Sequence, residues 1–237
     1  AFVVERAGCV QERGLNGIVE LLATTMVNSA FHGTRLDAEF IKEAFDDVIK
    51  KVENKTGSKR VDFASRCFFM SHETYTPARG GSSAAEIEAL RFAFGKAANQ
   101  VLIANTKGYT GHPMGASLED VVAIKGLQRQ VLPAIANLHD VDPDFADLNF
   151  AQGGGIDAAY AFRFSAGFGS QIAISAYGKL ATQEERLLDP EKYRHWLNDI
   201  SGREDAALEI VDRTLRISES GGLEAWELGV PSLVCVD

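Results

Sequence analysis

The chain has too few cysteines for a disulfide framework, since its 237 residues include only Cys9, Cys67 and Cys235. Their wide spacing and odd number match neither a set of disulfides nor a zinc site. Free cysteines of this kind are most often small buried hydrophobic residues. Their scarcity indicates a reducing compartment, so we expect a cytoplasmic protein without a metal site.

Long apolar runs and blocks of basic residues are absent as well. No apolar stretch approaches the length of a membrane span, and no charged-then-apolar signal opens the chain. The 24 basic and 33 acidic residues give a net charge of −9, which argues against nucleic-acid binding. We therefore expect neither a membrane nor a nucleic acid as a partner. The chain begins on Ala1 instead of methionine, so we expect a fragment of a longer polypeptide.

What remains is an ordinary globular composition, 46 % hydrophobic and 24 % charged, in which strand-like and helix-like stretches alternate. This alternation predicts a layered α/β fold. The predicted strands cover residues 17–26, 67–70, 101–105, 160–165 and 171–177. The predicted helices cover residues 38–52 after the N-cap Asp37, then residues 84–94 and 115–130. After Gly178 the chain becomes highly charged, and helical patterns over residues 190–200 and 205–216 predict a helical appendage.

Two histidines stand where a side chain can reach a ligand. His72 lies two residues after the end of a predicted strand and opens the sequence His-Glu-Thr-Tyr-Thr-Pro. His112 lies in a glycine-flanked loop between a predicted strand and a predicted helix, and Lys107 precedes it in the same loop. A loop histidine taken alone is more often structural. These contexts occur together and in order, which favours a role at a functional site.

The combined motifs resemble the C-terminal half of a β-ketoacyl synthase (ketosynthase). The resemblance rests on the order His-x-Thr-x-Thr-Pro, then Thr-Lys-x-x-x-Gly-His-x-x-Gly-Ala, then Gly-Phe-Gly between two strands, at residues 72–77, 106–116 and 167–169. Residues 2–8, which resemble a strand of that family, and residues 86–90, 132–138 and 142–144 are further similar pieces. The resemblance covers residues 1–178, and residues 187–216 resemble the connector that follows some ketosynthases.

The resemblance implies a fold and a set of roles. The fold is a thiolase-like α/β half with a mixed five-stranded sheet covered by helices, followed by a helical C-terminal extension over residues 179–237. His72 and His112 would stabilise the enolate of a decarboxylating extender, and Lys107 would fix the electrostatics of the pocket. Phe168 would be the gating residue whose backbone N–H helps to form an oxyanion hole. The substrate-binding residues implied for the phosphopantetheine arm are Thr74 and Thr76.

The resemblance also implies partners. The domain would use no bound cofactor, because phosphopantetheine arrives on an acyl carrier protein. The nucleophilic cysteine of the family lies in the N-terminal half of the ketosynthase, and none of the three cysteines here occupies its place. We therefore expect that half as a partner, a homodimer in the intact enzyme, and no activity in this chain alone.

Several departures from the family pattern leave alternatives open. Glu73 stands where the family usually has glycine, Ala166 replaces a common aromatic residue, and residues 170–172 differ from Gly-Thr-Asn. A thiolase shares the second histidine motif, but its downstream catalytic cysteine is missing between Ser165 and Ser170. A non-catalytic, ketosynthase-like scaffold is the other alternative. The acyl chain length and the extender unit do not follow from the sequence.

Overall fold

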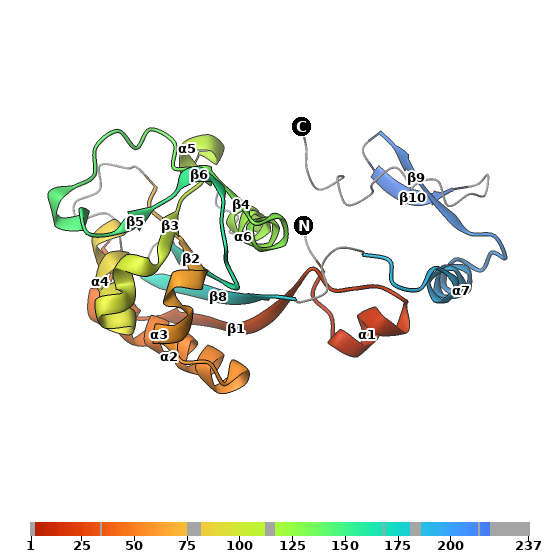
Figure 1. Cartoon of the computed structure of the whole chain (residues 1–237), viewed down its shortest axis with the longest axis horizontal. Coiled ribbons are helices and arrows are strands. Elements are labelled where there is room, and N and C mark those ends of the chain that lie inside the picture. Colours follow the sequence, from red (N-terminus) through yellow and green to blue (C-terminus); the bar gives the residue numbers. More distant parts are fainter. Residues whose placement is uncertain are drawn as a thin grey trace. The chain divides into compact units, whose positions relative to one another are not determined.

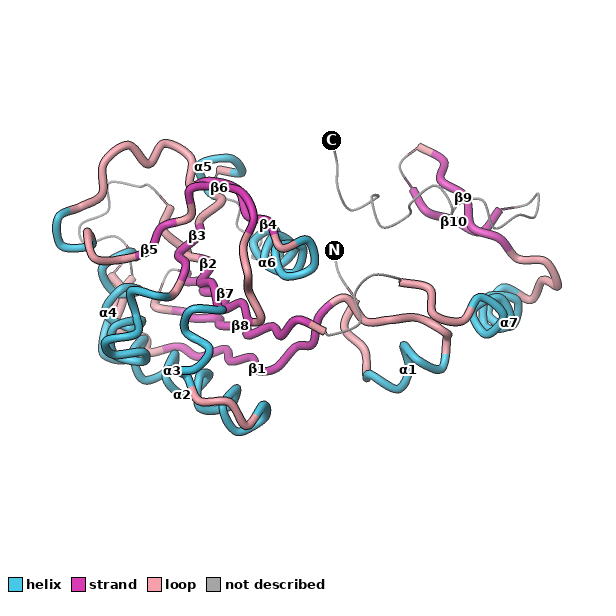
Figure 2. The backbone as a smooth tube through the Cα atoms, in the orientation of Figure 1, coloured by secondary structure: helices cyan, strands magenta, loops and turns pink. Residues whose placement is uncertain are grey.

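The structure, a computed structural model, is shown in Figures 1 and 2. It describes residues 3–33, 35–74, 82–111, 117–167, 169–180, 186–212 and 214–218. Contacts divide the chain into two compact units. The larger comprises residues 1–2 and 19–180, and the smaller comprises residues 3–18 and 181–237. The predicted domains were residues 1–178 and 179–237, so the observed grouping differs in placing residues 3–18 with the C-terminal segment.

A six-stranded mixed sheet forms the centre of the larger unit, in the order β1-β8-β7-β2-β3-β5. Its strands are β1 (Val19–Asn28), β2 (Cys67–Met70), β3 (Leu102–Ala104), β5 (Asn149–Phe150), β7 (Tyr160–Gly167) and β8 (Gln171–Lys179). The first pairs, β1 with β8 and β8 with β7, are antiparallel, whereas β7, β2, β3 and β5 run parallel. All five predicted strands are present. The expected number of five was nevertheless wrong, because the sheet has a sixth strand, β5, whose two residues are too few to show a sequence period.

Helices cover both faces of this sheet. On one face lie α2 (Ala38–Thr56) and α4 (Ser83–Phe94), which pack against each other. Asp37 caps α2 by accepting a hydrogen bond from the N–H of Phe40, and Gly57 ends the helix with a left-handed φ of 73°. The helix α6 (Ser117–Arg129) packs against β7 and β8. It lies on the opposite face, because Arg163 reaches it while the neighbouring residues of β7 point into the other layer.

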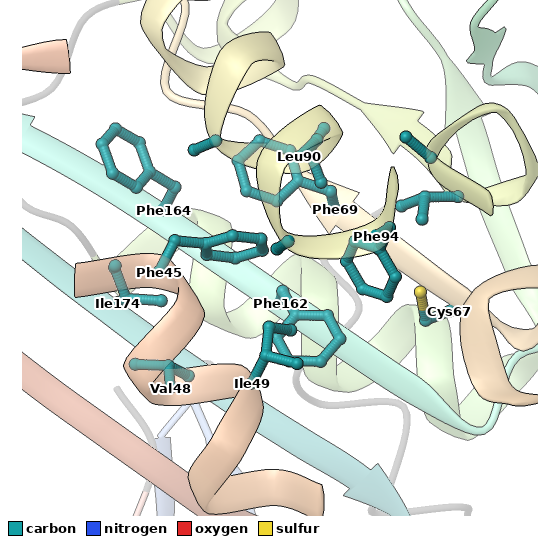
Figure 3. Close-up of a cluster of buried hydrophobic side chains, with 14 of the residues drawn as sticks. Phe45, Val48, Ile49, Cys67, Phe69, Leu90, Phe94, Phe162, Phe164 and Ile174 are labelled. Atoms are coloured by element: carbon teal, nitrogen blue, oxygen red, sulfur yellow. The ribbon is translucent and has the colours of Figure 1, made fainter. Parts of the chain in front are cut away.

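An aromatic cluster fills the core between the sheet and the helices α2 and α4 (Figure 3). The ring of Phe45, fully buried, lies 5.6 Å from Phe69 and 5.8 Å from Phe162, both in edge-to-face geometry. Burying one such side chain contributes about 1.5–3 kcal/mol. The rigid core therefore fixes the strands whose ends carry the residues discussed below.

Short elements complete the larger unit. They are α3 (Arg60–Phe63), η1 (Ala64–Arg66), η2 (Gly95–Gln100), α5 (Lys107–Thr110), η3 (Pro143–Phe145) and the antiparallel strands β4 (Val131–Ala134) and β6 (Gln152–Gly155). Among the described helices, none is both long and apolar enough to cross a membrane.

The smaller unit is mixed, so the expectation of a helical extension was wrong. Its elements are α1 (Ala7–Glu12), α7 (Pro190–Ser201) and the antiparallel hairpin β9 (Ala207–Val211) and β10 (Thr214–Ser218). The predicted helix at 190–200 is confirmed, whereas the helix predicted over residues 205–216 is wrong, because residues 207–211 and 214–218 form the two strands of the hairpin. Asp212 has a left-handed φ of 51° that allows the chain to reverse there.

The N-terminal segment forms backbone hydrogen bonds with the residues that precede α7. The N–H of Asn16 donates to the carbonyl of Arg186 at 2.8 Å, and Val10 and Leu15 share a small core with Tyr193 and Leu197. The strand expected over residues 2–8 was wrong, since residues 3–6 adopt no regular structure and α1 follows. Val3 is 87 % exposed and packs into no layer, which explains why this short apolar run forms no strand.

Candidate functional site

Three parallel strands bring the predicted site segments to one edge of the sheet. β2 pairs with β3 on one side and with β7 on the other, so their carboxyl ends lie together. His72 follows the end of β2, and Lys107 follows the end of β3. In open α/β sheets, ligands bind outside the carboxyl ends of parallel strands. The topology therefore places the His72 and Lys107 segments beside each other where a ligand would be expected.

The backbone around His72 is fixed by hydrogen bonds. The N–H of Ser71 donates to the carbonyl of Ala104 at 2.8 Å, which extends the β2–β3 ladder by one bond beyond the strands. The N–H of His72 donates to Oε2 of Glu86 at 3.1 Å, and the imidazole ring lies 6.5 Å from the ring of Phe164. These bonds fix the backbone of His72, and its imidazole ring therefore stays near the carboxyl end of β2, beside Phe164.

Glu73 ties the same segment to the start of α4. Its Oε1 accepts from the N–H of Thr74 at 2.8 Å, and its Oε2 accepts from the N–H of Ser83 at 2.9 Å. The Ser83 N–H is one of the donors that a helix leaves without an internal partner. Glu73 thus caps α4 from the residue directly after His72, and Thr74 is held as part of this arrangement.

The carboxyl group of Glu86 is buried beneath His72. Glu86 is 1 % exposed. Burial raises its pKa to about 7, against the opposing effect of hydrogen bonds from Ser71, Ser82 and the N–H of His72, while the charge of Glu73 adds to the increase. The group therefore changes charge near neutral pH at a position that touches the backbone of His72.

Lys107 is a buried cation with a buried partner. Its Nζ lies 2.6 Å from Oε1 of Glu119, and the two side chains are 3 % and 2 % exposed. Lys107 was among the predicted site residues, whereas Glu119 was not. The sequence does show two acidic residues, Glu119 and Asp120, in the first turn of a predicted helix. Acidic residues there are usually exposed and interact with the positive end of the helix dipole, so the pattern did not indicate a buried ion pair. Lys107 thus faces the first turn of α6 in the interior of the unit.

The ion pair continues into a larger buried cluster. Arg163 on β7 lies 3.8 Å from Oε2 of Glu119 and 3.6 Å from Oδ1 of Asp120. Asp120 in turn accepts a hydrogen bond from the hydroxyl of Tyr177 at 2.8 Å. Burial raises the pKa of Asp120, and Arg163 and Tyr177 oppose that increase; burial and the nearby Asp120 also raise the pKa of Tyr177. The cluster connects Lys107, through α6, to the middle of the sheet.

Three predicted site residues, Thr76, His112 and Phe168, lie outside the described residues. Their places in the sequence still relate them to the strands, since His112 follows β3 and α5, and Phe168 directly follows β7. Their predicted roles therefore stay predictions.

The described cysteines lie away from the His72 segment. Cys67 begins β2, at the opposite end of that strand from His72, and its Sγ donates to the carbonyl of Ala64 at 3.3 Å. Burial raises the pKa of the Cys67 thiol far above its usual range. Cys9 is in the smaller unit, and Cys235 lies outside the described residues. Among the residues placed by the structure, no group of three histidine, cysteine or carboxylate side chains could hold a metal ion.

Comparison with solved structures defines the class of fold. The structure superimposes on a beta-ketoacyl synthase from Burkholderia phymatum with a TM-score of 0.63 and 23 % identity, over 74 % of this chain and 41 % of that one. A type II PKS acyl-carrier protein in complex with its ketosynthase, bound to the hexaketide, matches with a TM-score of 0.61 and 23 % identity, over 74 % and 42 % of the chains. The fold is therefore the thiolase-like α/β fold of ketosynthases.

Sequence comparisons point to the same family. Residues 38–139 match the family model of the beta-ketoacyl synthase C-terminal domain. The chain is 30 % identical over 152 residues to 3-oxoacyl-(acyl-carrier-protein) synthase 2 of Coxiella burnetii, covering 62 % of this chain and 34 % of that enzyme. It is 29 % identical over 185 residues to the Vibrio harveyi enzyme of the same name, covering 76 % and 42 %. Residues 38–139 thus resemble a beta-ketoacyl synthase C-terminal domain, and the chain spans less than half the length of these curated relatives.

Proposed function

We propose that this chain is the C-terminal part of a β-ketoacyl synthase that catalyses decarboxylative Claisen condensation in fatty-acid or polyketide synthesis. The observation that carries the proposal is the arrangement of the His72 and Lys107 segments at the ends of adjacent parallel strands, within the stretch that matches the family. The substrates would be an acyl thioester and a malonyl-type thioester on an acyl carrier protein. Phosphopantetheine would arrive on that carrier, and the domain itself would bind no cofactor.

The proposed chemistry needs donors for a developing negative charge. When the malonyl thioester loses carbon dioxide, the electron pair of the broken C–C bond forms an enolate, which attacks the acyl thioester and expels the enzyme's thiolate. His72 and His112 would each donate an N–H to the enolate oxygen. Lys107, held by Glu119, would supply a fixed positive charge beside the site. Thr74 and Thr76 would contact the phosphopantetheine arm, and Phe168 would gate entry and offer its N–H to the thioester oxygen.

The nucleophile would come from the N-terminal half of the ketosynthase, and the intact enzyme would be a homodimer. Cys67 supports this proposal, because its thiol is buried at the far end of β2 with a raised pKa. We therefore expect that this chain, incubated with acyl and malonyl carrier-protein thioesters, forms no ketoacyl product. Product formation would mean that one of its own cysteines is the nucleophile, or that a different reaction class applies.

The histidine roles are tested in the complete protein that carries the nucleophile. His72→Ala and His112→Ala should each slow decarboxylation of the malonyl thioester by about 10²–10³-fold, the usual effect of losing one positioned donor. Acylation of the cysteine should persist in both. His139→Ala is the matched control, since His139 is an exposed histidine. Decarboxylation by His112→Ala at the unmodified rate would refute the assignment, and a complete protein that neither acylates nor decarboxylates would favour a scaffold role.

A further inference from the structure

We infer that Asn105 is a positioning residue that holds His72 in register with the Lys107 segment, an inference that rests on the proposed function. Asn105 is 4 % exposed and directly follows β3. Its Nδ2 donates to the carbonyl of Glu73 at 2.8 Å and to the carbonyl of Ser71 at 3.4 Å. These are the residues immediately before and after His72, so one side chain grips both sides of the histidine.

The other end of the same amide reaches the second segment. Oδ1 of Asn105 accepts a hydrogen bond from the N–H of Lys107 at 2.8 Å. The orientation of the amide follows from its partners, because the two carbonyl groups require a donor and the Lys107 N–H requires an acceptor. Asn105 therefore makes one continuous connection from the backbone around His72 to the backbone of Lys107.

The hydrogen bonds of Asn105 begin where the backbone hydrogen bonds between β2 and β3 end. The ladder between β2 and β3 ends with the bond from the Ser71 N–H to the Ala104 carbonyl. Beyond that bond, the side chain of Asn105 cross-links the two segments. A side chain with two N–H donors and one carbonyl acceptor on a short stem is needed for this, and among the common residues asparagine meets that description.

The consequence is preorganisation of the histidine. A donor that stabilises a transition state must already be in place, and a displacement of about 1 Å can cost about 10² in rate. Loss of the Asn105 bonds removes this donor from the buried carbonyl of Ser71 and the half-buried carbonyl of Glu73, which frees the His72 segment to move. Asn105 itself has no reacting group, so it acts on the reaction through His72.

Asn105→Asp tests this inference with little change in shape. The variant keeps an acceptor for the Lys107 N–H but loses both donors. In this 237-residue chain, amide hydrogen exchange at Ser71, His72 and Glu73 should become about tenfold to a hundredfold faster, while exchange at Val48 in the core is unchanged. Asn105→Ala, which adds no charge, should act in the same direction. Asn149→Asp on the exposed face of β5 is the matched control. Unchanged exchange at His72 in both variants of Asn105 would overturn the inference.

The catalytic arm uses the complete protein. Asn105→Asp should lower the rate constant of malonyl-thioester decarboxylation by about tenfold to a hundredfold, with little change in KM and in cysteine acylation. Added to His72→Ala, it should cause little further loss, because both changes act on the same donor. A full additional loss in the double variant would mean that Asn105 does not act through His72. If the unsubstituted protein does not decarboxylate, the proposed function fails, and the exchange measurement still decides whether Asn105 holds the segment.

Discussion

Substitution of Glu119 by glutamine should destabilise the larger unit more than substitution of Lys107 by methionine. Four buried charges meet around these residues, since Lys107 and Arg163 balance Glu119 and Asp120. Glu119→Gln leaves Lys107 without the carboxylate at 2.6 Å, its one ionic partner among the described residues. Lys107→Met, in contrast, leaves Glu119 and Asp120 with Arg163 between them. The two variants therefore differ in how completely the remaining charges are compensated.

The magnitude follows from the distance and the burial. Two unit charges 2.6 Å apart attract by about 6 kcal/mol at an effective dielectric constant of about 20. Desolvation of each ion offsets several kcal/mol of this attraction, so the intact pair contributes little net stability. Removing one partner leaves the other as a buried charge whose desolvation is no longer offset. We therefore expect Glu119→Gln to lower the free energy of unfolding by about 3–5 kcal/mol and Lys107→Met by about 2–3 kcal/mol. The larger loss corresponds to a decrease in Tm of about 10 °C.

Urea denaturation and thermal unfolding of this chain test the expectation. Glu39→Gln is the control, because Oε1 of Glu39 also lies 2.6 Å from a lysine, Lys42, but the Glu39 side chain is 81 % exposed. That control should leave Tm essentially unchanged. The double variant of Lys107 and Glu119, each changed to methionine, should lose less stability than the two single methionine variants combined. Additive losses, or a Glu119→Gln variant as stable as the Glu39→Gln control, would show that the buried pair is not coupled as the distances indicate.

Three further predictions concern pH, packing and the contacts of α2. The pKa of Glu86 is about 7 in the folded state against an ordinary 4.5, so its contribution to stability is fully present below about pH 4.5 and is lost as the pH rises through about 7. Glu86→Gln should remove about 3 kcal/mol of pH dependence between pH 4.5 and 7.5, measured by urea denaturation at each pH, and an unaltered pH profile would refute this. Gly126→Ala should lower the free energy of unfolding by about 1–3 kcal/mol, because a Cβ there would lie 2.7 Å from a methyl carbon of Leu132. Gly8→Ala in α1, where nothing lies within 4 Å of the added Cβ, should instead raise the Tm. Equal changes in Tm for the two variants would contradict this prediction. Arg60→Ala should cost about 2 kcal/mol and Arg60→Lys less, since Arg60 bonds Glu53 through two nitrogens, and an unchanged urea midpoint would argue against that contact.

The periodic elements of the fold were predictable from the sequence. Ile41, Phe45 and Val48 recur at helical spacing, and all three are fully buried in α2. The hairpin of β9 and β10 was predicted as a helix, because Leu208, Val211 and Leu215 also recur at the spacing of one helix face. The two-residue strand β5 was missed because its pairing with β3 is a tertiary contact, and so short a segment has no sequence period of its own.

The candidate site was predictable at the level of segments. The placement of His72 and Lys107 at strand ends follows from motif and pattern, and the parallel pairing of β2 and β3 brings those ends together. The supporting residues could not be found this way. Glu119 and Arg163 look like surface charges in the sequence, and Asn105 looks like the last residue of a predicted strand. Their roles depend on which elements meet in three dimensions, and a one-dimensional pattern does not contain that information.

Two departures from the family pattern are accompanied by hydrogen bonds of the substituted residues. Glu73 replaces a usual glycine, yet its φ is not left-handed, so the backbone there does not need glycine. The new carboxylate instead bonds Thr74 and caps α4 at Ser83. Ser170 also replaces a usual glycine, at a left-handed φ of 56°, and its hydroxyl donates to the carbonyl of Arg35 at 2.9 Å. Both substitutions add contacts that hold the segments in place, which is the requirement of a site that works by positioning.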